Sequence, residues 1–360
     1  MAQREETRLL LDSMNRLFEE RSTKEIVDRA EKGAFPAELW KAVAETGVPL
    51  AAVPEAAGGI GAEWGDILAA LRVAGRHAAP IPLAETMIAA WLAAEAGLET
   101  TDGPMSFGPV RKEDRLMLER DGAGWRLSGT AARVPWGRQA EKLVLLAEGP
   151  GGEMVVALDG TNSAEVTPGK NLAGEPRDTL RFEAVPVSGA AAAPAKAGVD
   201  RAEAYRRGAL SRALLMSGAM ERALDIALAY VPERKQFGRP ISKFQAVQQN
   251  MAVLAGQVAA AGAAADGGAE ALSHPDPELR ELLIAVAKTR CGDAATLAAE
   301  LAHQVHGAIG FTQEYALQLF TRRLWSWRDE FGAEGEWAAV IGRIVCARGA
   351  AALWPTLTQA

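Results

Sequence analysis

The segment VPERKQFGRPISKFQAVQQ, residues 231–249, carries the densest set of side chains suited to binding a charged ligand. Two aromatic residues, Phe237 and Phe244, stand among four basic ones: Arg234, Lys235, Arg239 and Lys243. A basic turn beside a helix N-terminus is a good receptor for a pyrophosphate, because guanidinium and free backbone N–H groups both bind phosphate oxygens. Phe237 would offer a flat apolar surface to a ring. A solvated turn with a buried phenylalanine explains the same pattern, so both interpretations stay open.

A second segment, HQVHGAIGFTQEY at residues 303–315, places Gln304 beside the small pair Gly307 and Ala308 at the expected end of a helix. Small residues let the backbone approach a ligand closely. His303 and His306 are three residues apart on that helix, but no cysteine or acidic third ligand accompanies them, so we predict no metal site. The sequence contains neither a phosphate-binding P-loop nor a GxSxG nucleophile motif.

Helical, stranded and again helical stretches follow one another along the chain. Short Val/Leu/Phe-rich runs separated by glycine turns indicate strands at 115–119, 124–128, 142–147, 153–158 and 179–183. The helical period returns at Arg201 and predicts a first long helix that ends just before Pro232. Two further helices are expected over 241–272 and from 279 to about 306.

The predicted fold class is α+β and multidomain. It combines an N-terminal α-helical domain at 1–103, a small middle β-barrel or sandwich domain at 104–198, and a C-terminal four-helix bundle at 199–360. The alanine-rich stretch 188–200 is expected to be a linker.

Composition excludes several classes of protein. With 39 basic against 46 acidic residues the net charge is −7, which argues against a nucleic-acid partner. No apolar run approaches the roughly 18 residues of a membrane span. The N-terminus shows no signal-peptide pattern, and the two cysteines, Cys291 and Cys346, are far apart in sequence. These features predict a cytoplasmic protein.

Several segments together resemble the acyl-CoA dehydrogenase family of flavoproteins. The most specific are RKQFGRPISKFQAVQ (234–248) and QVHGAIGFTQEY (304–315). PEAAGG (54–59) is similar to that family's PExxGG loop, and the stretches 125–147 and 171–187 resemble parts of its β domain. The resemblance covers nearly the whole chain in order, and it implies the same helix–strand–helix architecture.

The resemblance implies FAD as cofactor, an acyl-CoA substrate and electron-transfer flavoprotein as partner. Family members are usually tetramers in which subunits share FAD, so a homotetramer or a heterotetramer with a second acyl-CoA dehydrogenase subunit is expected. Carried over to this chain, one group would serve the pyrophosphate and ring end of a neighbour's FAD: Arg234, Gln236, Phe237, Phe244 and Gln245. A second group would lie against the adenosine half: Gln304, Val305, His306, Gly307 and Ala308.

The implied reaction is α,β-dehydrogenation of a thioester, in which a carboxylate removes the α-proton and a hydride passes to the flavin. The family's usual base is a glutamate followed by glycine. An ungapped count places Phe331 and Gly332 there, with Glu330 one position earlier. Either a one-residue gap brings Glu330 into the catalytic site, or the base is lost. Alternatively, Asp329 and Glu330 are solvated helix-end charges paired with nearby arginines, namely Arg322, Arg323 or Arg328.

A second base position known in the family falls at about 209–212, where no carboxylate stands. Glu203 and Glu221 lie at some distance from it and are expected on the surface. The family's SEPxxGSD loop has no counterpart in 100–116. Its flavin-facing Trp-x-Thr is replaced by a segment ending in Pro135, which has no N–H to offer, followed by Trp136. Trp136 would pack either on the flavin or in the core of the sheet.

These departures leave several functions open. The chain is expected to be an acyl-CoA dehydrogenase that acts alone or within a heteromer. One alternative is a catalytically degenerate structural subunit that completes the FAD site of its partner. Another is a related flavoprotein oxidase or monooxygenase. The acyl group is not determined by the sequence.

Overall fold

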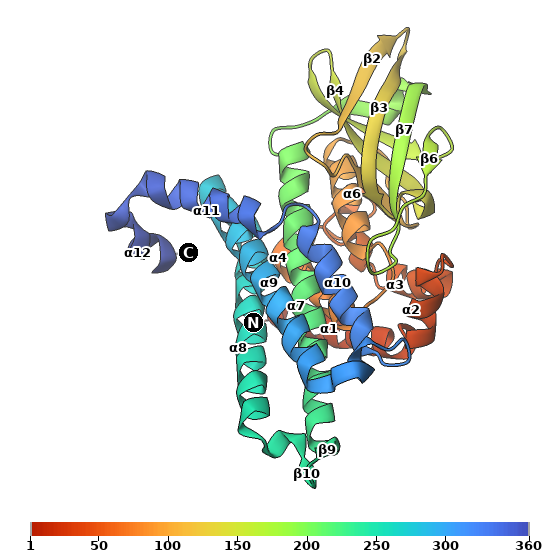
Figure 1. Cartoon of the computed structure of the whole chain (residues 1–360). Coiled ribbons are helices and arrows are strands. Elements are labelled where there is room, and N and C mark those ends of the chain that lie inside the picture. Colours follow the sequence, from red (N-terminus) through yellow and green to blue (C-terminus); the bar gives the residue numbers. More distant parts are fainter. Residues whose placement is uncertain (1, 359–360) are drawn as a thin grey trace. The chain divides into compact units, whose positions relative to one another are not determined.

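The computed structural model describes residues 2–358, and its chain forms two compact units (Figure 1). The first unit contains residues 1–18, 68–79 and 209–360, and the second contains 19–67 and 80–208. Helices α1 (Ala2–Arg21) and α7 (Arg201–Glu233) each contribute to both units. The expected order of helices, sheet and helices is confirmed, whereas the domain boundaries at 103 and 198 stay predictions.

The second unit begins with three short helices and a longer buried one. The short helices are α2 (Lys24–Glu31), α3 (Ala37–Ala44) and α4 (Trp64–Ile67), and the buried helix is α6 (Leu83–Glu95). Residues 83–93 of α6 are all buried, and apart from Glu85 and Thr86 they are apolar. The Thr86 hydroxyl fixes α6 to strand β1 (Met105–Gly108) by accepting from the Met105 N–H at 2.9 Å and donating to its carbonyl at 3.2 Å.

The remainder of the second unit is an eight-stranded sheet. Its strands run in the order β6-β7-β3-β2-β4-β5-β8, and β1 pairs with β4 in parallel. The other bounds are β2 (Arg115–Asp121), β3 (Gly124–Pro135), β4 (Lys142–Gly149), β5 (Gly152–Asp159), β6 (Glu165–Thr167), β7 (Arg177–Val187) and β8 (Ala192–Pro194). Strand β8 lies within 188–200, so the expectation of a plain linker there is wrong. Its three residues pair with β5 and extend the sheet.

Three long helices dominate the first unit. Helices α7, α8 (Gln245–Glu270) and α9 (Pro277–His306) lie side by side (Figure 1). They approach so closely that a Cβ added at Gly268 would come within 2.9 Å of both Leu210 and Ala287. The remaining elements are α5 (Ala69–Arg76), α10 (Leu317–Asp329), α11 (Glu334–Arg348), α12 (Ala350–Thr358), β9 (Lys235–Gln236) and β10 (Arg239–Pro240).

Helix α7 differs from its expected end. It continues through Pro232 and ends at Glu233, so the proline lies in the last turn and disrupts only the end of the helix. Short 3-10 helices punctuate the chain at Val48–Leu50, Glu55–Ala57, Gly137–Gln139, Gly189–Ala191, Ile241–Lys243, Ala271–Ser273 and Gly307–Phe311. Within residues 2–358, no helix has both the length and the apolar character required to cross a membrane.

Candidate cofactor-binding site

A tight hairpin connects α7 to α8. Strands β9 and β10 pair Gln236 with Arg239, so that Phe237 and Gly238 form a two-residue turn with φ of 51° and 80°. Two successive left-handed residues are the pattern of a type I′ hairpin, in which glycine is readily accommodated and phenylalanine is not. The Phe237 side chain is 93% exposed despite this backbone cost. An exposed aromatic residue in a strained turn is available to contact a ligand.

The hairpin forms one wall of a surface hollow, of about 320 Å³, in the first unit. The opposite wall comes from the end of α9, more than sixty residues further along the chain. Its lining is largely apolar and consists of Gln236, Phe237, Ile241, Phe244, Ala246, Val247, Asn250, Gln304 and Val305. Five of the residues singled out in the sequence are therefore neighbours in space: Gln236, Phe237, Phe244, Gln304 and Val305.

Aromatic and basic side chains around the hollow contact one another. The rings of Phe237 and Phe244 meet edge to face with centroids 6.1 Å apart. The Arg239 guanidinium lies over the Phe244 ring at 4.2 Å, which fixes the cation beside the apolar surface. Arg234 and Gln245 are exposed on the same connection but do not line the hollow. The alternative of a phenylalanine buried in the core is wrong for Phe237.

The other predicted residues at the end of α9 have different environments. Gly307 and Ala308 are exposed just beyond the last helical turn. His306 is buried, and its Nδ1 lies 2.7 Å from the Ala302 carbonyl, so Nδ1 carries the proton. Its Nε2 then accepts from the Tyr315 hydroxyl at 3.1 Å.

The imidazole of His306 also stacks on Tyr230 with centroids 4.4 Å apart. Burial lowers its pKa below the ordinary value for histidine. In the described structure His306 therefore joins α9 to its neighbouring segments as a neutral residue, and it does not line the hollow.

Pro135 and Trp136 belong to the second unit. The carbonyl of Pro135 accepts a hydrogen bond from the Ser106 hydroxyl. Trp136 is 4% exposed, with φ of 55°, and packs edge to face on Phe35 with centroids 6.4 Å apart. These contacts favour the core-filling interpretation of Trp136, and a flavin contact stays a prediction.

The candidate base Glu330 immediately follows α10. Its side chain is 17% exposed and accepts a hydrogen bond from Arg212 Nε at 2.6 Å. Arg212 is fully buried on α7, and its guanidinium also lies over the Phe331 ring at 5.1 Å. The alternative of a solvated helix-end charge is therefore wrong for Glu330, which has an arginine partner on a different helix. The expected pairing with Arg322, Arg323 or Arg328 stays a prediction.

Arg212 is a residue that sequence reasoning missed. It lies 118 positions before Glu330, and its own helix shows no periodic signal that distinguishes it. The hint in the sequence is that Arg212 falls at 209–212, the second base position of the family, where an arginine stands and no carboxylate does. The expected surface position of Glu203 is also wrong. Glu203 is buried and pairs with Arg206 and Arg207 at 2.9 and 3.0 Å.

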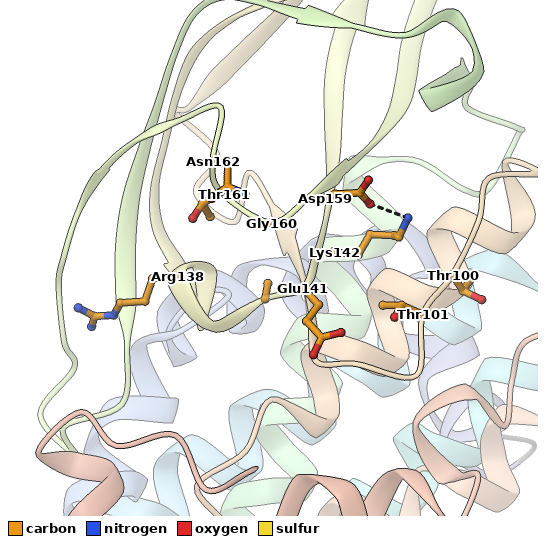
Figure 2. A pocket seen from close by; sticks show the side chains of 10 residues that line it. Thr100, Thr101, Arg138, Glu141, Lys142, Asp159, Gly160, Thr161 and Asn162 are labelled. Atoms are coloured by element: carbon orange, nitrogen blue, oxygen red, sulfur yellow. Dashed lines mark hydrogen bonds and ion pairs between the residues drawn. The ribbon is translucent and has the colours of Figure 1, made fainter.

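Figure 2 shows a polar hollow in the second unit, between the segment after α6 and the ends of β4 and β5. Its cations already have anionic partners. Lys142 pairs with Asp159 at 3.0 Å, and Arg138 pairs with the buried Asp178 at 3.3 Å. None of the sequence-predicted site residues lines it.

Across the part of the chain that the structure describes, no three His, Cys, Asp or Glu residues are grouped as a metal site requires.

Comparison with known proteins agrees with this architecture. Residues 4–101 match the acyl-CoA dehydrogenase N-terminal domain, and residues 179–334 match the acyl-CoA dehydrogenase C-terminal domain. Acyl-CoA dehydrogenase IpdE2 of Mycolicibacterium smegmatis is 28% identical over 322 residues, covering 89% of this chain and 92% of that protein. Acyl-CoA dehydrogenase FadE34 of Mycobacterium tuberculosis is 28% identical over 309 residues, which is 84% of this chain but 42% of FadE34.

Two solved structures share the fold over nearly the whole chain. The ChsE4–ChsE5 complex of Mycobacterium tuberculosis gives a TM-score of 0.86 at 22% identity, covering 96% of this chain and 98% of that chain. A variant of the steroid acyl-CoA dehydrogenase Tcur3481–Tcur3483 gives 0.83 at 25% identity, with coverage of 95% and 98%. The chain belongs to the acyl-CoA dehydrogenase family, whose members are FAD-dependent oxidoreductases acting on CH–CH bonds.

The residues around the hollow fit part of FAD. A flat exposed ring, a largely apolar lining and the amide groups of Gln236 and Gln304 suit a nucleotide or ring. The exposed basic residues of the hairpin suit the pyrophosphate. The hollow accommodates only a portion of such a ligand, so the rest of FAD would contact other surfaces.

Proposed function

We propose that this chain takes part in FAD-dependent α,β-dehydrogenation of an acyl-CoA thioester, and that the hollow beside the hairpin holds part of FAD. The observation that carries the proposal is the assembly of Phe237, Phe244 and Gln304 around one exposed hollow. Phe237 would pack against the cofactor, and Arg234 would bind its pyrophosphate. Bound FAD would supply the acceptor for the hydride removed from the β-carbon.

We further propose that the chain is the FAD-completing subunit of a heteromeric enzyme. Its hairpin residues are exposed and available to a neighbouring subunit. Glu330, in contrast, is engaged in an ion pair with the buried Arg212, so its carboxylate already has a partner within the chain. Phe331, which an ungapped count places at the position of the usual base, carries no ionisable group. The partner subunit would then supply the base.

The two-component names of the Tcur3481–Tcur3483 and ChsE4–ChsE5 neighbours are consistent with this assembly. A homotetramer that uses Glu330 as its base is the competing arrangement. Electron-transfer flavoprotein as electron acceptor and a cytoplasmic location belong to the same proposal.

The flavin content of the purified protein tests the assembly. We expect substoichiometric FAD when the chain is purified alone and stoichiometric FAD when it is produced together with the product of the neighbouring gene. Flavin absorbance divided by protein concentration gives the ratio, and light scattering gives the mass of the assembly. One FAD for each chain in the solitary preparation would rule out the heteromer.

A separate measurement tests the reaction class. Acyl-CoA thioesters of several sizes, added without oxygen, should bleach the bound flavin of the complex. If no thioester bleaches it, a related oxidase or monooxygenase becomes the better assignment.

A further inference from the structure

A charged side chain is buried against the turn that carries Glu330. Lys288, on α9, is 1% exposed. Its ammonium donates to the carbonyl of Arg328 at 2.5 Å and to that of Gly332 at 2.7 Å. A buried ammonium is costly unless it is hydrogen-bonded, and here both described bonds go to one turn, at its first and last residues.

That turn, residues 328–332, has an unusual backbone. Helix α10 ends at Asp329, after which Phe331 and Gly332 both have positive φ, at 54° and 88°. A non-glycine residue in this region costs about 1–2 kcal/mol, so other contacts must hold it there. The last carbonyl groups of a helix also lack partners within the helix.

Three side chains fix this turn from different elements. Lys288 binds the carbonyls at its two ends, and the Trp337 indole on α11 donates to the Phe331 carbonyl at 2.8 Å. Between these bonds Glu330 faces Arg212, and Phe331 is buried beneath the same guanidinium. The conformation of the turn therefore sets where the Glu330 carboxylate and the Phe331 ring lie against Arg212.

We propose that Lys288 is a positioning residue whose buried ammonium holds the 328–332 turn in the conformation that seats Glu330 on Arg212. Charge-assisted bonds are roughly twice as strong as neutral ones, so loss of the ammonium charge weakens both bonds to the turn. The turn then gains access to conformations in which Glu330 leaves Arg212. Lys288 thereby controls whether Glu330 is held as an ion pair or is released.

The surroundings of Lys288 support a response to pH. Burial lowers the pKa of Lys288 to about 8. The groups facing it are Glu330 from the turn, Glu334 from α11, Arg212 from α7 and Cys291 from α9. Burial raises the pKa of Cys291 to about 12, so this thiol stays neutral while Lys288 titrates. The turn should therefore loosen as the pH rises through about 8.

Hydrogen exchange of peptides that cover the turn tests this proposal directly, with rates corrected for the intrinsic effect of pH. In the wild type, protection of the turn should fall by about tenfold between about pH 7 and about pH 9, because the two bonds lose their charge. Lys288→Met, which keeps the length of the side chain, should exchange about tenfold faster at the lower pH and show no further change.

Arg290→Met is the matched control, because Arg290 is two residues away on α9 and bonds instead to Gln257. It should follow the wild-type pH profile. If Lys288→Met keeps wild-type protection and its pH dependence, the proposal is overturned. Should that variant not fold, constant protection of the wild-type turn across the same pH range would also overturn it. The readout needs neither FAD nor turnover, so it is independent of the proposed function.

Discussion

The backbone strain at Phe237 indicates that this residue has a function beyond stability. A bulky side chain at φ of 51° is strained, and its near-complete exposure means that no burial compensates for the strain. In the chain by itself, the edge-to-face contact with Phe244 is the described interaction that favours phenylalanine at this position. We therefore predict that Phe237 contacts a ligand or a neighbouring subunit.

Substitution of Phe237 should therefore separate stability from cofactor binding. Phe237→Asn places a residue that tolerates the left-handed region, so we expect a melting temperature equal to or above that of the wild type, with a gain of up to about 1 kcal/mol. Loss of ring packing should weaken FAD binding by roughly tenfold. Calorimetry and flavin titration of the assembled protein measure the two effects.

Leu9→Ala serves as the control for loss of an exposed apolar side chain, since Leu9 lies on α1 and is 60% exposed. It should change neither quantity appreciably. A Phe237→Asn variant that keeps full FAD affinity would remove Phe237 from the proposed site.

At the scale of the elements, the small side chains of alanine and glycine allow the helices to pack closely. Helix α5 lies against α7 so closely that a Cβ built on Gly218 would overlap the Arg72 carbonyl. Helix α8, in contrast, has Gly256 on an exposed side, where a Cβ would meet no atom within 4 Å. Two glycines in long helices of one unit thus have opposite surroundings.

The same substitution should have opposite effects at these two positions. Gly218→Ala forces α5 and α7 apart and should lower the free energy of unfolding by about 1–3 kcal/mol. Gly256→Ala should raise it by about 0.5–1 kcal/mol, because alanine has the higher helix propensity. Denaturant titration of both variants checks the signs. Equal effects would mean that the α5–α7 contact is looser than described.

The elements that sequence periodicity predicted were the long ones. Strand β1 was missed because all four of its residues are buried, which leaves no alternation to detect. Strand β8 was missed because its alanines and proline resemble a linker. At the site, the hairpin and the end of α9 were located by motif, and the structure adds their proximity. The Arg212–Glu330 pair joins α7 to the end of α10, and no local pattern announces a contact over such a separation.

For the whole molecule, the position of the base decides whether this chain works alone. The bulk charge of −7 conceals a basic hairpin available to a neighbour, while the chain's own candidate base is engaged by Arg212. Glu330→Gln tests this directly, because the amide keeps an oxygen that can accept from Arg212 Nε but loses the carboxylate. In a heteromer whose partner supplies the base, dehydrogenation by the assembled complex should stay within about threefold of the wild type. A homotetramer that uses Glu330 should lose at least about 10²-fold in kcat.

The control for loss of charge is Asp329→Asn, because Asp329 is an exposed carboxylate one residue earlier. Single-turnover flavin reduction measures the chemical step in both variants. A large loss confined to Glu330→Gln would assign the base to this chain and contradict the FAD-completing role.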